Sequence, residues 1–361
     1  MIRRAAPFWI SIFTLLITVG ATLIGGWWAL VPLVANYHLA SVVDRLTGEA
    51  DTSLDENTPR EALWAYDIVL KLWPVFQVAL FIWFFWYVPQ ADHLSLAAKV
   101  MLAFGLAGNF GLVGITYAHE LMHRRNAWDT WRADILLGCV AYGPFRTEHL
   151  LGHHIFVATP KDPVTARYNE GFWTFFPRAV RGTFASAWEI ETRRLTRQNR
   201  PWWHGSNPFY RYAGLGLLAM ALSLTLGGFE GLGLWAIAAF GSILSLELTN
   251  YIEHYGLERR KLPNGKYEPT RPHHSWNCDL KFSNWLLINL QRHSDHHFKP
   301  ERPFAVLQTY DPDTAPVLPY GYTRLGMIAL WPRRWRKVMN PQVRAWRKQF
   351  YPDAAQWPIC E

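Results

Sequence analysis

Long apolar segments separated by polar ones dominate the first third of the chain. Residues 5–43 contain no Asp, Glu, Lys or Arg. At about 1.5 Å per residue, one helix of this length would be roughly twice as long as the ~30 Å core of a bilayer is thick. We therefore expect two membrane-spanning helices, 7–25 and 26–43, joined by a tight turn at Gly25-Gly26. A single long tilted helix with an extension along the membrane surface is the alternative.

Further apolar segments complete the predicted membrane part. They predict spans over residues 68–88, 96–118, 211–229 and 231–252, and Glu230 separates the last two. We predict an all-α integral membrane protein with six transmembrane helices, in which residues 1–361 form one membrane-embedded domain. The mostly polar segments 119–210 and 253–361 are expected outside the bilayer. An even number of spans places both segments and both chain ends on the same side.

The charge distribution predicts which side this is. The chain has 36 Lys and Arg against 28 Asp and Glu, a net charge of +8, and its basic pairs lie beside apolar segments and near the C-terminus. Cytoplasmic loops of membrane proteins carry such an excess of basic residues. We therefore place the polar segments and both termini in the cytoplasm, and the spans in the inner (plasma) membrane. The acidic 44–61 loop fits less well, but acidic residues contribute little to orientation. Nucleic-acid binding is not expected.

Cysteine usage excludes one class of metal site. The three cysteines, Cys139, Cys278 and Cys360, are far apart, so the chain has no CxxC pair for a thiolate-bound iron or zinc. They offer no disulfide framework either, which agrees with a reducing cytoplasmic side.

Histidines are concentrated where the apolar segments end. Nine of the 14 histidines fall in four short clusters: His119 and His123; His149, His153 and His154; His254; and His293, His296 and His297. Neutral imidazole is the commonest metal ligand in proteins. Nine nitrogens are too many for one tetrahedral ion, but they suit two ions with four or five histidines each. Imidazole binds iron, copper, zinc and nickel alike, so ligand type does not choose the metal.

The spacing within the clusters supports this prediction. His119 and His123 are four residues apart, which places both side chains on one face of a helix. The second cluster repeats this spacing, and the last offers spacings of three and four. Metal-bound histidines usually donate their second N–H to a carboxylate or carbonyl. Four acidic residues beside the clusters are candidates for this role, and Glu253 is also a candidate ligand: Glu120, Glu148, Glu253 and Asp295.

Two other classes of metalloprotein must be weighed. Residues 119–123 match the HExxH pattern of zinc metalloproteases, with Glu120 as the general base. A membrane protease of this kind needs one more ligand and leaves six of the clustered histidines unexplained. A metal transporter would hold its ion near the bilayer midplane, whereas these histidines lie at span ends and in polar segments.

The motifs also resemble those of a known family. Residues 250–257 (NYIEHYGL), 272–277 (PHHSWN), 290–297 (LQRHSDHH) and 157–163 (VATPKDP) are similar to the integral-membrane non-haem di-iron alkane 1-monooxygenases, within the wider desaturase–hydroxylase group. The resemblance extends from the first hairpin to about residue 353. The 290–297 string is long and far more specific than HExxH alone.

This resemblance implies a six-helix membrane fold with a cytoplasmic di-iron site. It implies O2-dependent hydroxylation of the terminal carbon of alkanes, with electrons from rubredoxin and an NAD(P)H-dependent rubredoxin reductase. The nine clustered histidines match the family's iron ligands, and His273 and His274 match a family segment near the site. Because the chain lacks the four paired cysteines of a rubredoxin, we expect the electron donor to be a separate protein.

The sequence also departs from the family pattern. Leu150 follows His149 where the family usually has Asn, which affects hydrogen bonding around the site but removes no histidine. Residues 119–125 (HELMHRR) look equally like the related xylene methyl hydroxylases. Hydroxylation of a methyl-aromatic, or desaturation of an acyl chain at the same di-iron site, therefore remains an alternative to alkane hydroxylation.

Overall fold

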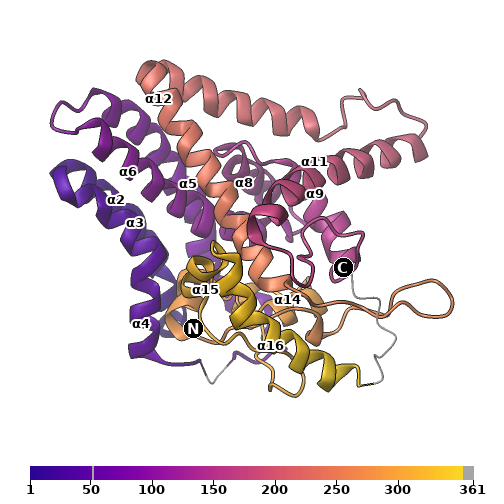
Figure 1. The fold of residues 1–361 in the computed structure, drawn as a ribbon. Helices are drawn as coiled ribbons and strands as arrows, with labels where there is room; N and C mark the ends of the chain where they lie inside the picture. Colours follow the sequence, from indigo (N-terminus) through magenta and orange to yellow (C-terminus); the bar gives the residue numbers. More distant parts are fainter. Residues whose placement is uncertain (51–52, 353–361) are drawn as a thin grey trace.

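The structure, a computed structural model, describes residues 1–50 and 53–352; Cys360 lies outside them. Within these ranges the chain is helical and forms isolated β-bridges but no strand (Figure 1). The α-helices are α1 (Ile2–Ala5), α2 (Ile10–Ile24), α3 (Val31–Val34), α4 (Ala40–Thr47), α5 (Trp64–Tyr87), α6 (Leu96–Ala107), α7 (Thr116–Met122), α8 (Ala127–Gly138), α9 (Pro144–Glu148), α10 (His154–Phe156), α11 (Phe172–Arg197), α12 (Phe209–His254), α13 (Lys281–Leu286), α14 (His293–Phe298), α15 (Tyr322–Ala329) and α16 (Pro332–Phe350).

Four helical stretches in the described residues are long and apolar enough to cross a membrane. They are Ile2–Ile24, Arg60–Gln90, Leu96–Met122 and Phe209–His254. The all-α prediction is therefore confirmed, and the chain has the helices of a membrane protein. The number of six crossings stays a prediction.

The first apolar segment forms the predicted hairpin. Helix α2 ends at Gly25, whose φ of 73° reverses the chain direction, so the turn at Gly25-Gly26 is confirmed. The returning arm is not the regular helix expected over 26–43. It is a succession of short turns of different pitch: η2 (Gly26–Leu30), α3, η3 (Ala35–Leu39) and α4. Pro32 in the first turn of α3 has no N–H to donate, which interrupts the regular hydrogen bonding of a helix.

Helix α12 contains both of the last two predicted spans. Its 46 residues bend sharply at Gly228, with φ 61° and ψ −158°. Only glycine adopts this backbone conformation readily, so the bend lies at Gly228 rather than at Glu230, the residue expected to separate the spans. In Figure 1 the two arms of α12 form a wide V whose apex is near the label.

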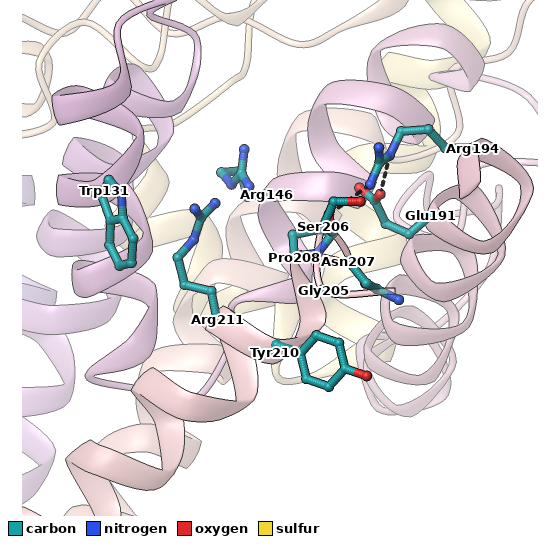
Figure 2. A pocket seen from close by; sticks show the side chains of 10 residues that line it. All are labelled: Trp131, Arg146, Glu191, Arg194, Gly205, Ser206, Asn207, Pro208, Tyr210 and Arg211. Atoms are coloured by element: carbon teal, nitrogen blue, oxygen red, sulfur yellow. Dashed lines mark hydrogen bonds and ion pairs between the residues drawn. The ribbon is translucent and has the colours of Figure 1, made fainter. Parts of the chain in front are cut away.

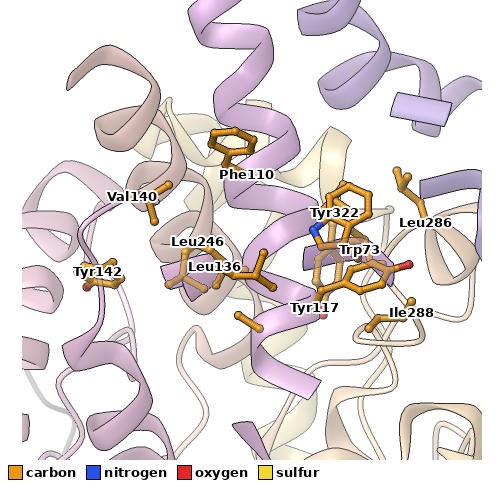
Figure 3. Packing of buried hydrophobic residues seen from close by; sticks show 14 of the residues in the cluster. Trp73, Phe110, Tyr117, Leu136, Val140, Tyr142, Leu246, Leu286, Ile288 and Tyr322 are labelled. Carbon is orange, nitrogen blue, oxygen red and sulfur yellow. The ribbon is translucent and has the colours of Figure 1, made fainter. Parts of the chain in front are cut away.

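The second arm of α12 packs closely against the helix that carries the first histidines. Between α6 and α7 the chain forms a π-helical segment, η6 (Gly108–Ile115). At Gly111 an added Cβ would lie 2.5 Å from the Cα of Ser242 on α12, so only glycine fits there. Figure 3 shows Phe110 and Tyr117 from this helix beside Leu246 from α12, in the buried core.

Polar side chains also join the membrane helices. The Asn36 amide donates to the backbone oxygen of Gly105 and to Asn109 Oδ1, both at 3.0 Å, and Asn109 donates to Thr18 at 2.6 Å. In an apolar environment no water is present to pair with these amide and hydroxyl groups, so they must bond to one another or to the backbone. They fix the hairpin against α6 and η6.

The C-terminal third covers one end of the helices. Helices α14, α15 and α16 lie around and below the lower end of α12 in Figure 1. Tyr322 of α15 donates a hydrogen bond to Glu253 near the end of α12 (2.8 Å), and the Trp276 N–H donates to the Glu253 carbonyl (2.9 Å). All four histidine-bearing segments therefore meet at this end of the bundle.

Candidate metal centre

The structure brings together all nine predicted histidines. They come from the end of α7, from a π-helical segment η7 (His149–His153) with α10, from the last residue of α12, and from α14. Their ring nitrogens form two groups, and within each group one nitrogen per residue lies within 4.8 Å of all the others. The five-histidine group contains His119, His123, His149, His154 and His296, and the four-histidine group contains His153, His254, His293 and His297.

The distances between the nitrogens fit shared metal ions. Metal–imidazole bonds of about 2.1 Å place neighbouring ligand nitrogens about 3.0 Å apart at right angles, and about 3.4 Å apart in a tetrahedron. Six pairs of neighbouring Nε2 atoms, three in each group, lie 2.9 to 3.2 Å apart. For example, His293 Nε2 lies 3.1 Å from His254 Nε2 and 3.0 Å from His297 Nε2. One lone pair or one N–H cannot satisfy both neighbours, whereas a metal ion accepts a lone pair from each.

Helix geometry decides which histidines share a group. His119 and His123, and likewise His293 and His297, are four residues apart and belong together, as the α-helical spacing predicts. In the second cluster it is His149 and His154, five residues apart, that share a group. Segment η7 is π-helical, so its backbone hydrogen bonds join residues five apart and turn His154 toward His149. His153 consequently joins the other group.

Burial keeps the imidazoles in the neutral form that binds metal. Burial, with a smaller contribution from the nearby His153, lowers the pKa of His123 to about 4. It also lowers the pKa of four other histidines well below the ordinary value: His149, His154, His296 and His297. Ligand nitrogens must be unprotonated, so these rings need no deprotonation near neutral pH.

Asp162 orients one of the histidines, although it was not among the site residues predicted from the sequence. His153 Nδ1 lies 2.8 Å from Asp162 Oδ2, and both groups are buried. Thr165 donates to the same oxygen at 2.6 Å, and the Val164 N–H donates to the other at 3.0 Å. With its proton held on Nδ1, His153 presents the lone pair of Nε2 to the group. The only sequence signal was its place in the family-like 157–163 stretch.

Glu253 approaches the four-histidine group from α12. Its Oε2 atom lies 3.2 Å from His293 Nε2, the nitrogen that faces His254 and His297. Its Oε1 atom accepts the 2.8 Å hydrogen bond from Tyr322. This carboxylate is therefore the only one of the four predicted acidic residues in contact with a clustered histidine in the described part of the chain.

The other three carboxylates have different partners. Asp295 accepts hydrogen bonds from Arg302, Tyr310 and the Gln308 N–H, at 2.6 to 2.9 Å, so it orders the segment after α14. Glu120 accepts from the Phe304 N–H at 3.2 Å and from Arg124 at 3.5 Å. Among the described residues, neither carboxylate forms the expected bond to an imidazole, because these other partners hold it.

Glu148 is buried next to His149 but bonds to Ser186 Oγ, at 3.5 Å. Its other oxygen has no hydrogen-bond partner among the described residues. Burial raises its pKa well above the ordinary value, and the nearby Asp162 and Glu247 raise it further. A protonated carboxyl is the form that this environment favours.

His273 and His274 lie outside both groups. Both contact the hydroxyl of Tyr351, at 3.1 and 2.7 Å, and His274 Nδ1 accepts from the Arg271 N–H at 2.9 Å. Ser294 Oγ on α14 donates to the Ser275 carbonyl at 2.7 Å. The pair therefore supports the segment that packs against α14, rather than joining the histidine groups.

A small cavity lies between the membrane helices and the histidines. Its free volume is about 20 Å³. Apolar side chains of η6, α12 and the loop before α14 form most of its wall, and His119, His149 and His293 lie at its polar end. The first two belong to the five-histidine group and the third to the other, so the cavity reaches both. Leu150, which stands where the resembling family usually has Asn, is half-buried and packs against the core.

Comparisons with known proteins agree with this arrangement. The fatty acid desaturase family model matches residues 93–329. Alkane 1-monooxygenase 2 of Pseudomonas aeruginosa is 34% identical over 323 residues, which cover 88% of this chain and 84% of the relative. Alkane 1-monooxygenase 1 of Alcanivorax borkumensis is 37% identical over 327 residues, 89% of this chain and 78% of the relative.

A relative of another kind is also similar. The hydroxylase component of the xylene/toluene monooxygenase of Pseudomonas putida is 30% identical over 266 residues, which cover 73% of this chain and 69% of that protein. The chain therefore belongs to the fatty acid desaturase family and, within it, is a relative of the alkane 1-monooxygenases.

Proposed function

We propose that this protein hydroxylates the terminal methyl group of an alkane, or of another alkyl chain, at a di-iron centre held by its nine clustered histidines. The reaction consumes the alkane, O2, two electrons and two protons and yields a 1-alkanol and water. The observation that most directly supports this proposal is the apolar cavity that reaches both histidine groups. The names of the relatives support the substrate class.

The apolar wall of the cavity is expected to bind the substrate. Leu112, Ile115 and Leu246 offer no polar group to the alkyl chain, so a methyl end is placed against the histidines by shape and water exclusion alone. Small residues on η6 let α12 approach closely and keep this space narrow.

The polar residues around the groups are expected to position the ligands. Asp162 holds the proton on His153 Nδ1, and Tyr322 orients the Glu253 carboxylate toward His293. When bound, the two irons would supply O2 reduction and the insertion of one oxygen atom into the C–H bond. The histidines fit two ions. The relatives are named monooxygenases, and O2 reduction needs a redox-active metal such as iron, which zinc is not.

We further propose that the electrons come from rubredoxin, a separate protein reduced by an NAD(P)H-dependent rubredoxin reductase. Rubredoxins expose an iron–thiolate centre, for which the chain itself has no paired cysteines. The net charge of +8 would attract an acidic donor, and such rim charges mainly raise the association rate.

The protein is proposed to cross the inner (plasma) membrane six times. The hairpin at Gly25 and the bend at Gly228 each divide an apolar segment into two arms, which supports six crossings. Both termini and the histidine groups would then face the cytoplasm, where the basic residues are most frequent.

Product analysis with labelled oxygen tests the proposed reaction. The purified, iron-loaded protein, with rubredoxin, its reductase and NADH, is supplied with octane under 18O2. We expect 1-octanol that carries one 18O atom, and no product without the reductase. Unlabelled alcohol, or NADH consumption without any alcohol, would contradict the proposal.

Hydroxylation of a methyl-aromatic is the second candidate, because the xylene/toluene monooxygenase component covers most of the chain. The same assay with p-xylene separates the two substrate classes. A benzylic alcohol formed much faster than 1-octanol would favour the aromatic substrate. An alkene product from an acyl chain would instead indicate a desaturase.

A further inference from the structure

A second cavity, of about 450 Å³, lies between α8, α9, α11 and the start of α12 (Figure 2). It shares no residue with the cavity at the histidines. Its volume is within the range of about 300–1,000 Å³ that is common for pockets that bind small molecules. The wall includes three arginines, from α9, α11 and α12.

Two of these arginines share one buried carboxylate. Arg146 Nε lies 2.8 Å from Asp134 Oδ1, and Arg211 Nε lies 2.6 Å from Asp134 Oδ2. Asp134 is fully buried and is the only acidic side chain that pairs with either arginine in the described residues. Two positive charges are thus balanced by one negative charge. In Figure 2 the Arg146 and Arg211 side chains point toward the same space.

The third arginine adds no net charge but completes a polar wall. Arg194 Nε pairs with Glu191 at 2.6 Å, and its Nη2 donates to the Ser206 carbonyl at 3.1 Å. Ser206 and Asn207 line the same cavity. The cavity therefore carries one uncompensated positive charge, presented by planar guanidinium groups. Arginine in this arrangement is the residue that best recognises phosphate.

Exposed aromatic residues lie at the cavity and in the loop beside it. Trp202 and Trp203 in the loop before α12, and Tyr210 in its first turn, have more than half of their surface exposed. The Arg211 guanidinium stacks over Trp131 at 4.7 Å. Tryptophan and tyrosine collect at the level of the lipid headgroups. The first arm of α12, which begins here, exposes Leu217 and Leu218 as a lipid-facing helix would. The cavity thus lies where an apolar helix meets a polar surface.

We propose that this cavity binds the phosphate group of an anionic phospholipid, whose acyl chains lie along the first arm of α12. Arg146 and Arg211 bind the phosphodiester oxygens, and Ser206 and Asn207 contact the polar headgroup. Such basic pockets between membrane helices are suited to anionic lipids. The same guanidinium groups would accept a free phosphate ion, and the competition experiment below separates the two sources.

Native mass spectrometry of the detergent-purified full chain, titrated with dioleoyl phosphatidylglycerol, tests the proposal. Arg211→Gln is the informative variant, because Arg146 is only three residues from His149. Arg193→Gln is its matched control: Arg193 lies on α11 next to Arg194, but among the described residues its exposed side chain pairs only with Glu189. We expect roughly tenfold weaker binding for Arg211→Gln and an unchanged affinity for Arg193→Gln.

A second variant keeps the proposal falsifiable if Arg211→Gln fails to fold. Arg211→Lys retains the ion pair with Asp134 but loses the planar guanidinium group, which can donate two hydrogen bonds to one phosphate. This variant is expected to weaken lipid binding by about threefold. Wild-type affinity in both variants, or equal affinity of the wild type for dioleoyl phosphatidylcholine, would overturn the proposal. Displacement of the lipid by millimolar inorganic phosphate would keep the phosphate site and assign it to the soluble ion.

Discussion

The contact between His153 and Asp162 shows how one residue prepares a metal ligand. A neutral imidazole carries its proton on either nitrogen, and only the other nitrogen can bind metal. The 2.8 Å contact between Nδ1 and Asp162 Oδ2 keeps the proton on Nδ1. Asp162 is in turn held by Thr165 and the Val164 N–H, so the ring is fixed before any ion arrives.

Replacement of Asp162 by Asn should therefore weaken metal binding at the four-histidine group. Residues that orient a ligating histidine typically contribute a factor of about 10–100 to metal affinity or activity. We expect the Asp162→Asn protein to lose metal at a chelator concentration roughly tenfold lower than the wild type does, as measured by metal content after dialysis. Asp313→Asn, at an exposed position, is the control. Equal loss from both variants would contradict the role of Asp162.

Single residues were predicted with uneven success. The nine histidines could be identified from sequence because they are clustered, and two of the four clusters lie at the ends of predicted spans. Asp295 could not be excluded as a partner of the imidazoles, because its bonds to Arg302 and Tyr310 depend on how residues 299–310 fold back. Asp162 was missed because nothing local distinguishes it from a turn residue. The assignment of all nine histidines as ligands stays a prediction until a metal is measured.

At the scale of elements, irregular helices decide the geometry of the site. The π-helical segment η7 places His149 and His154 in one group, against the spacing rule that holds for an α-helix. The π-helical η6 and the last turns of α12 line the cavity beside the histidines. Hydrophobic periodicity does not reveal such changes of pitch, which is why the sequence predicted regular spans.

The bend of α12 can be tested at Gly228. Its φ of 61° and ψ of −158° are strained for any residue with a Cβ, at a cost of about 1–3 kcal/mol. We expect Gly228→Ala to lower the thermal unfolding temperature of the detergent-solubilised protein. Gly233→Ala is the matched control, because Gly233 is helical and has open space around it. A variant at Gly228 as stable as that at Gly233 would show that the bend does not require glycine.

The role of η6 in substrate selection can be tested at Leu112. This side chain lines the narrow cavity, so Leu112→Ala should widen it and admit bulkier substrates. We expect the ratio of p-xylene to octane turnover to rise severalfold. Leu106→Ala, fully buried on α6 but outside the cavity, should lower stability by about 2–5 kcal/mol without changing this ratio. A ratio that changes equally in both variants would show that the change comes from a general loss of core packing and not from the cavity wall.

At the scale of the whole molecule, the apolar helices and the histidine-rich end are clearly separated. The sequence predicted this division because charged residues are rare in the spans and frequent elsewhere. It could not predict how the C-terminal third folds over the helix ends, since contacts such as that between Tyr322 and Glu253 join residues far apart in the chain.

The predicted orientation can be tested by labelling single cysteines introduced at exposed positions. Asp92 lies in the turn between α5 and α6, and Asp55 lies in the loop before α5. A membrane-impermeant maleimide should label Asp92→Cys in intact spheroplasts, and Asp55→Cys only after the membrane is opened. The reverse pattern would place the histidine groups on the outside, where a cytoplasmic electron donor could not reach them.

The most direct test of the central claim is the metal content of the purified protein. The account predicts about two irons per chain in the wild type, and about one in His254→Ala or in His149→Ala, because each variant disrupts one group. His273→Ala, outside both groups, should keep both irons. Zinc in place of iron, or an unchanged iron content in both ligand variants, would contradict a di-iron centre held by these nine histidines.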